Sequence, residues 1–214
     1  MQLTMRQLIE KLDFDEIEKR LAENPQLANE GIPLDETDLR MAHPLHRICD
    51  YVFNNIHTDE DTIELANLFL KYGANVDGDE LVLKKDTPLL AAASLQAEKT
   101  ALLYVDKGAN IHHRGCHGGT ALHWAAWVGR DKLVKRLIDD GSDIHLRCID
   151  FNSTPLFWAI HGYKTGGEKN RHNQVECVRL LLQAGADKTV PNAYGKKPIE
   201  ILDAEDTTLL SLLQ

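Results

Sequence analysis

The chain repeats itself at intervals of about 33 residues. Thr87, Thr120 and Thr154 lie 33 and 34 residues apart, and each opens a similar stretch. In two of these stretches a glycine, Gly108 or Gly141, follows the threonine after 21 residues. A constant period of this length predicts stacked copies of one small helical unit, because a single copy is too small to bury its own apolar face.

Two further copies contain insertions. The interval from Thr154 to Gly185 exceeds the 21-residue interval by ten residues, and the interval from His43 to Gly73 exceeds it by nine. By register, the additional residues fall between the first and second helices of their copies, at about 52–60 and 163–172. Long surface loops cost little free energy, so these insertions are compatible with an unbroken stack.

Each copy predicts a pair of helices. Threonine followed by proline favours a helix start, since threonine caps the first turn and proline at the first helical position loses no hydrogen bond. Apolar residues at helical spacing, among them Leu137 and Leu181, predict a buried face on each second helix. A glycine in the left-handed conformation then ends that helix. The predicted pairs begin near 44, 88, 121, 155 and 198, and the second helices end near 72, 107, 140 and 184.

The recurring motifs resemble the ankyrin repeat. They are TALHWAA (120–126), with TPLLAAA and TPLFWAI at the same register, and the ending LLLQAGAD (180–187). The resemblance implies an all-α fold, a solenoid of stacked antiparallel helix pairs with β-turn fingers. The sequence departs from the motif at Leu90 and Phe157, which replace its histidine, and at Lys197, which replaces its threonine. We expect one domain over 1–214, with an N-terminal cap at about 1–36, repeats at about 37–80, 81–113, 114–147 and 148–191, and a C-terminal cap at about 192–214.

Metal-ligating residue types gather between residues 110 and 124, where the sequence reads NIHHRGCHGGTALHW. The resemblance implies that His123 ties neighbouring units by hydrogen bonds and that His112 is a finger residue. His113, Cys116 and His117 remain, and they define an alternative function, a metal-dependent enzyme or sensor. A stable zinc site needs a fixed set of ligands, and no fourth ligand is evident. We therefore expect no metal, no cofactor and no catalytic residue.

The composition of the chain disfavours several classes of protein. The net charge of −9 disfavours binding to nucleic acid, whose phosphates attract basic surfaces. No stretch approaches the 18 apolar residues of a membrane span, and the first residues do not resemble a secretory signal. The four cysteines form no CxxC pair. We expect a cytoplasmic monomer that contacts no membrane.

The resemblance implies a non-enzymatic module that binds another protein through a concave groove, formed by the fingers and the first helices. Such a module serves as an inhibitor or immunity-type partner, an adaptor or a subunit of a complex. We expect Trp127 at the centre of the groove, clear of the packing between repeats; alternatively, its ring folds back onto Val128. Trp124 and Trp158 are expected in the core. The predicted partner-binding residues are Tyr51, Leu95, His117, Trp127, Val128, Phe151 and His161.

Overall fold

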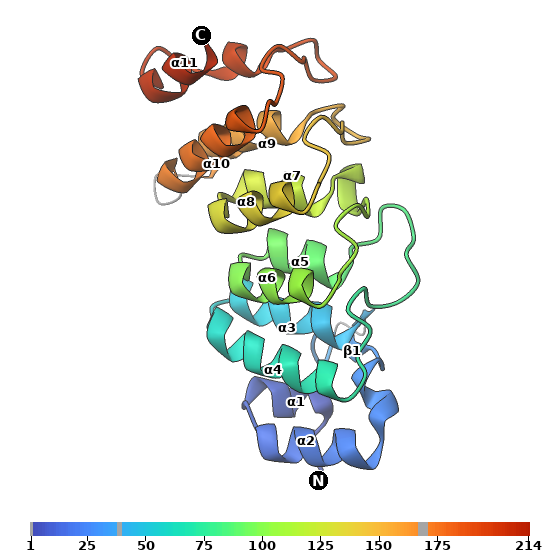
Figure 1. Cartoon of the computed structure of the whole chain (residues 1–214). Helices are drawn as coiled ribbons and strands as arrows, with labels where there is room; N and C mark the ends of the chain where they lie inside the picture. Colours follow the sequence, from blue (N-terminus) through green and yellow to red (C-terminus); the bar gives the residue numbers. More distant parts are fainter. Residues whose placement is uncertain (1, 38–39, 167–170) are drawn as a thin grey trace. The chain divides into compact units, whose positions relative to one another are not determined.

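The computed structural model describes residues 2–37, 40–166 and 171–214. These residues form short helices and one two-stranded sheet, as predicted for an all-α repeat fold (Figure 1). The chain divides into two compact units, each described here on its own. Unit 1 comprises Met1–Leu81 and Thr87–Asn110, and unit 2 comprises Val82–Asp86 and Ile111–Gln214. The boundaries of the caps and of the four repeats stay predictions.

The described residues of unit 1 form three helix pairs. Within it, α1 packs against α2, α3 packs against α4 and α5, and α4 packs against α6. The strands β1 and β2 form an antiparallel hairpin at the predicted finger between the cap and the first full repeat. The elements are α1 (Met5–Glu10), α2 (Phe14–Glu23), η1 (Pro25–Ala28), β1 (Ile32–Pro33), β2 (Met41–Ala42), α3 (Pro44–Phe53), α4 (Asp59–Lys71), α5 (Pro88–Ser94) and α6 (Glu98–Asp106).

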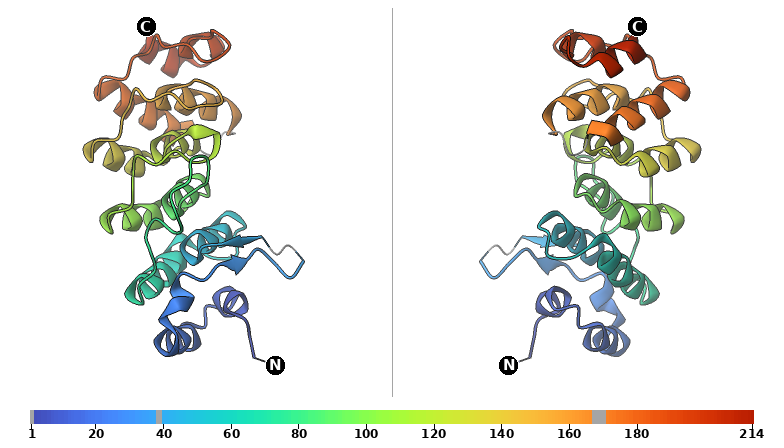
Figure 2. Two further views of the ribbon diagram at one scale, coloured as in Figure 1. Left: turned by 90° about the vertical axis from the view of Figure 1, so that its right-hand side faces the viewer. Right: turned by 90° about the vertical axis from the view of Figure 1, so that its left-hand side faces the viewer.

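Unit 2 carries the remaining layers, which follow one another in chain order in the views of Figure 2. Within it, α7 packs against α8 and α9, α10 packs against α8 and α9, and α11 packs against α10 and η4. The elements are η2 (Cys116–Gly118), α7 (Ala121–Val128), α8 (Asp131–Asp139), α9 (Pro155–Thr165), α10 (Arg171–Gln183), η4 (Pro198–Ile201) and α11 (Thr207–Leu213).

The predicted helix starts are confirmed. Helix α9 begins at Pro155, and the side chain of Thr154 accepts a hydrogen bond from the backbone N–H of Phe157. Thr87 caps α5 in the same way. At α7 the motif threonine and histidine act together, because Nδ1 of His123 lies 3.1 Å from the backbone nitrogen of Thr120. These caps satisfy N–H groups that have no partner inside the helix.

The second helices end as predicted. Helix α8 stops at Asp139 and α10 at Gln183, and Gly141 and Gly185 follow with φ of 87° and 96°. Leu137 and Leu181 are fully buried, which confirms their place in the core. No helix among the described residues is both long and apolar enough to cross a membrane.

The insertions lengthen helices as well as loops. Helix α9 has 11 residues and α10 has 13, whereas the uninterrupted pair α7 and α8 has 8 and 9. Helices α3 and α4 are likewise extended, to 10 and 13 residues. Part of the predicted insertion at 163–172 lies outside the described residues, namely 167–170.

Candidate functional site in unit 2

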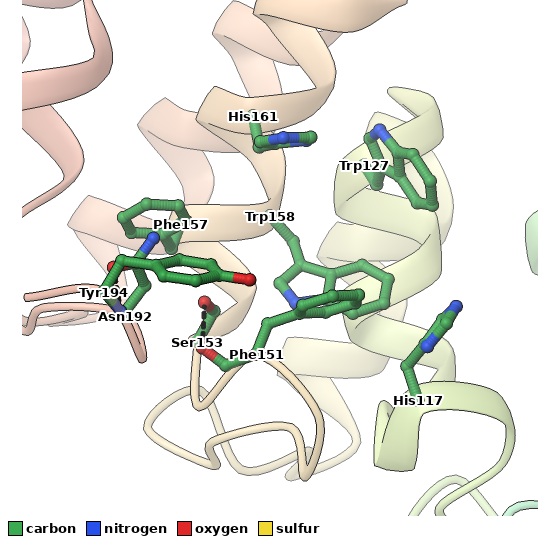
Figure 3. Close-up of a pocket in the computed structure, with 9 residues that line it drawn as sticks. All are labelled: His117, Trp127, Phe151, Ser153, Phe157, Trp158, His161, Asn192 and Tyr194. Atoms are coloured by element: carbon green, nitrogen blue, oxygen red, sulfur yellow. Dashed lines mark hydrogen bonds between the residues drawn. The ribbon is translucent and has the colours of Figure 1, made fainter. Parts of the chain in front are cut away.

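A pocket of about 320 Å³ opens between helices α7 and α9 and the fingers of unit 2 (Figure 3). Its walls are mainly aromatic. Figure 3 shows Trp127 and His117 on one side, Phe157 and Tyr194 on the other, and Trp158 between them. The lining residues are His117, Trp127, Phe151, Ser153, Phe157, Trp158, His161, Asn192 and Tyr194. Concave, largely apolar surfaces with a few polar groups are where ligands bind in proteins.

The close approach of α7 and α9 depends on a glycine. A Cβ atom at Gly162 would lie 2.1 Å from the carbonyl oxygen of Trp127 and 2.4 Å from its ring. The same carbonyl accepts a 2.6 Å hydrogen bond from Nε2 of Gln174, a buried side chain of α10. The position of Trp127 is therefore set from two neighbouring helices.

The prediction that Trp127 stands clear of the packing between repeats is wrong. Its ring stacks on Trp124 at 5.2 Å and meets Trp158 of the next repeat edge to face at 5.5 Å. Its indole N–H donates to the hydroxyl of Thr165 at 3.3 Å. Trp158 is buried as predicted, whereas Trp124 keeps partial exposure. Trp127 is thus both a wall of the pocket and part of the contact between α7 and α9.

The fingers place the remaining rings. His117 has a left-handed backbone, with φ of 56°, and its carbonyl accepts hydrogen bonds from the N–H groups of Ile149 and Asp150. The carbonyl of Phe151 accepts in turn from the N–H of Ala193 at 2.8 Å. Each finger is therefore held by the next through its backbone. The side chain of Phe151 lies over His117, with ring centroids 4.9 Å apart, and stays 38% exposed.

Tyr194 closes the far side of the pocket from the last finger. Oδ1 of Asn192 accepts hydrogen bonds from the backbone N–H groups of Tyr194 and Lys196. Such a turn, centred on an asparagine side chain, fixes the backbone without using the tyrosine ring. Tyr194 is 80% exposed, so its ring is presented to solvent beside the pocket.

One carboxylate lies beside the pocket and is already paired. Oδ1 of Asp150 lies 2.5 Å from Nζ of Lys84, and Oδ2 lies 3.1 Å from Nδ1 of His117. Hydrogen bonds from Lys84 and then from His117 hold the pKa of Asp150 below its ordinary value. Asp150 therefore stays ionised and organises the finger tips.

The structure does not bring the proposed metal ligands together. His113 bonds through Nε2 to the carbonyl of Lys85 at 2.8 Å, while His117 faces Asp150. Burial, followed by the carboxylate of Asp86, raises the pKa of the Cys116 thiol, which disfavours the thiolate needed for metal binding or nucleophilic attack. Within the described ranges, no group of three or more His, Cys, Asp or Glu side chains is placed to hold a metal ion.

Three predicted site residues lie elsewhere. Tyr51 belongs to unit 1 and is 5% exposed, against the ring of His57. Its prediction as a groove residue is wrong, and burial raises its pKa to about 12. Leu95, half-buried after α5, also belongs to unit 1. Val128 ends α7 half-buried and does not line the pocket.

Five lining residues were missing from the predicted site: Ser153, Phe157, Trp158, Asn192 and Tyr194. Phe157 had a signal in the sequence, since it replaces the histidine of the repeat motif. Tyr194 had another, because a finger tip seldom needs a large ring for folding. Phe157 and Trp158 are nearly buried and form the inner walls, so no surface criterion would have selected them.

The stacked helix pairs, with a glycine after α4, α6, α8 and α10 and with fingers bonded to one another, define a helical repeat protein. The motif histidine confirms the tie between repeats, because Nε2 of His123 lies 3.2 Å from the carbonyl oxygen of Leu146 and 3.3 Å from that of Ser153. The chain belongs to the ankyrin repeat family. Residues 55–148 match the model of three ankyrin repeats, and residues 151–193 match a further ankyrin repeat.

Known relatives share this repeat region. Palmitoyltransferase ZDHHC13 of Mus musculus is 36% identical over 97 residues, which are 45% of this chain and 14% of that protein. Ankyrin repeat protein OPG189 of Variola virus is 26% identical over 187 residues, or 85% of this chain and 30% of that protein. Palmitoyltransferase Hip14 of Drosophila melanogaster is 29% identical over 97 residues, again 45% of this chain and 14% of that protein. The matched stretch is thus less than a third of each of these relatives.

Proposed function

We propose that the chain is a non-enzymatic module that binds another protein, and that the aromatic pocket of unit 2 is its contact site. Ankyrin repeats are protein-interaction modules, which supports the first part. The observation that carries the second is the group of rings around one pocket, of which Phe151 and Tyr194 are exposed. Exposed aromatic side chains around a pocket are typical anchors of protein interfaces.

Phe151 and Tyr194 project from fingers whose backbone hydrogen bonds do not involve their side chains. A large exposed ring at such a position is better explained by binding than by the backbone structure of the finger. The predicted cytoplasmic setting and monomeric state belong to the same proposal, and sedimentation of the purified chain tests the second.

Site-specific photocrosslinking tests the site directly. p-Benzoylphenylalanine at position 194 should capture a partner in cells of the source organism, and the Phe151→Ser variant of that protein should lose the crosslink. The photocrosslinker at Phe53, an exposed residue of α3 in unit 1, is the matched control. Equal capture at both positions, or capture unaffected by Phe151→Ser, would remove the pocket as the contact site.

A further inference from the structure

The acidic character of the chain belongs to unit 1. Unit 1 contains 9 Lys and Arg against 20 Asp and Glu, a net charge of −11, whereas unit 2 contains 15 against 13, a net charge of +2. The pocket therefore lies on the unit that does not share the acidity of the whole chain. Because the two units differ in net charge, we expect them to attract partners of different charge.

Within unit 2, positive charge gathers on the fingers. The finger segments are 82–86, 111–119, 142–153 and 186–197. Together they hold seven Lys and Arg against four Asp, a net charge of +3, which exceeds the +2 of the unit. Four of the ten histidines of the chain also lie in them. The same segments supply five pocket residues, His117, Phe151, Ser153, Asn192 and Tyr194.

The finger carboxylates are used inside the fingers. Asp86 accepts a hydrogen bond from the N–H of Cys116, Asp143 accepts one from that of His145, and Asp187 accepts from both N–H and hydroxyl of Thr189. Asp150 is paired with Lys84 and His117. These carboxylates thus stabilise the finger backbone, and each has donors within the chain.

Two lysines follow Tyr194 in the last finger segment. Lys196 and Lys197 are exposed, two and three residues beyond the ring that closes the pocket. The side-chain amide of Asn192 adds a hydrogen-bond donor. Its oxygen accepts the hydrogen bonds of the turn, and its NH₂ group can donate to a ligand. The finger that closes this end of the pocket therefore carries a hydrogen-bond donor and two positive charges next to its lining residues Asn192 and Tyr194.

Other finger segments of unit 2 also carry exposed apolar side chains. Val82, Leu83 and Ile149 are all exposed, and their fingers are bonded to their neighbours. Lys84 N–H donates to the carbonyl of Arg114, just as Ile149 N–H donates to that of His117. Packed helix layers lie about 8–10 Å apart and an extended chain advances about 3.3 Å per residue. Every third residue of an extended segment would therefore meet a new finger.

We propose that the pocket receives an acidic, extended segment of the partner protein, with an aromatic or branched apolar side chain in the pocket and carboxylates against Lys196 and Lys197. This proposal rests on the proposed function and adds the chemistry of the partner to it. Further apolar residues, at intervals of three, contact the finger tips.

Selection from a random library tests this chemistry without knowledge of the partner. The probe is a phage-displayed library of 12-residue random peptides, selected on the immobilised full chain. The enriched peptides should contain large apolar residues at three-residue spacing with Asp or Glu between them. Enriched peptides that are neutral or basic would overturn the proposal.

The affinity of the most enriched peptide then tests the lysines. Fluorescence anisotropy of the labelled peptide should show about fivefold weaker binding to Lys196→Gln/Lys197→Gln, with the difference shrinking at high salt. The matched control is Lys132→Gln/Lys135→Gln, which removes the same charge from α8 of the same unit and should bind as wild type. Equal losses in both double variants would contradict a local role for Lys196 and Lys197.

The remaining outcomes separate this proposal from the function on which it rests. If no selected peptide depends on Phe151 and Tyr194, the extended acidic segment is wrong, while crosslinking from position 194 still decides whether the pocket binds a protein. If the wild-type chain self-associates in sedimentation and Tyr194→Ser prevents it, the occupant is a second copy of the chain, and the proposal is overturned.

Discussion

The indole rings of Trp127 and Trp158 meet edge to face, with centroids 5.5 Å apart and planes 89° apart. One ring belongs to α7 and the other to α9, so this contact joins two successive repeats. Because the same two rings form walls of the pocket, the shape of the site depends on the packing of the repeats.

Replacing Trp127 by alanine should lower the free energy of unfolding. The variant loses a stacked contact with Trp124 and an edge contact with Trp158, which together should cost about 2–3 kcal/mol for a partly buried ring. Urea unfolding measures the change. Tyr194→Ala, at an exposed ring of the same pocket, should cost less than about 0.5 kcal/mol. A Trp127→Ala protein as stable as Tyr194→Ala would show that the ring contacts do not hold the repeats together.

Gly162→Ala should destabilise the protein even though alanine favours helices. In an exposed helix this change stabilises by about 1 kcal/mol. Here the added Cβ would lie 2.1 Å from the carbonyl oxygen of Trp127, so α9 must move away from α7. We expect a net loss of about 1–3 kcal/mol, by the range known for overpacked sites. His161→Ala, at the exposed neighbouring position, is the control, and a rise in melting temperature for Gly162→Ala would refute the close approach.

Truncating the core should loosen neighbouring helices. Leu137→Ala and Leu181→Ala each remove a fully buried side chain and should cost on the order of 2–5 kcal/mol. Since α8 packs against α10, hydrogen exchange in α10 should accelerate in Leu137→Ala. Lys132→Ala, at an exposed position of α8, should leave exchange unchanged. Normal protection of α10 in Leu137→Ala would argue against coupling between adjacent repeats.

Acid should destabilise the fold through His123. Burial lowers its pKa from 6.5 to about 4, whereas the unfolded chain takes up this proton near pH 6.5. The unfolded state therefore binds more protons between these values, so stability is full above pH 6.5 and falls as the pH drops toward 4, by on the order of 3 kcal/mol. Urea unfolding from pH 7 to pH 4 measures this loss.

His123→Gln isolates that contribution from the carboxylates that also titrate in acid. The variant should be less stable at pH 7, because it loses hydrogen bonds within α7 and to the next repeat, but its stability should depend less on pH. His145→Gln changes an exposed finger histidine and should keep the acid dependence of wild type. Identical acid dependence in His123→Gln and wild type would mean that His123 is not the group responsible.

The helix boundaries were predictable because their signals are local. Thr154 caps α9 through residues within one turn, and Gly141 follows α8 with a positive φ that other residues seldom adopt. The burial of Leu137 was predictable for a similar reason, since helical spacing alone assigns a residue to one face. The 33-residue spacing then predicted where successive pairs begin.

The candidate site was predicted only in part. Trp127, Phe151, His117 and His161 do line one pocket, as their registers suggested. Tyr51 occupies the register of Gly162, one position after that of His161, and like Gly162 it is buried, in its case against the ring of His57.

By itself, the sequence determined the repeat period, the starts and ends of the helices, and the family. These features depend on capping, glycine conformation and apolar spacing, which act over a few consecutive residues. Only the tertiary structure decided that His117 pairs with Asp150 rather than with Cys116 or His113, and that Trp127 packs on Trp158. Those contacts join different repeats, so they depend on how one helix pair packs against the next. No pattern within a few consecutive residues specifies side-chain packing across that interface.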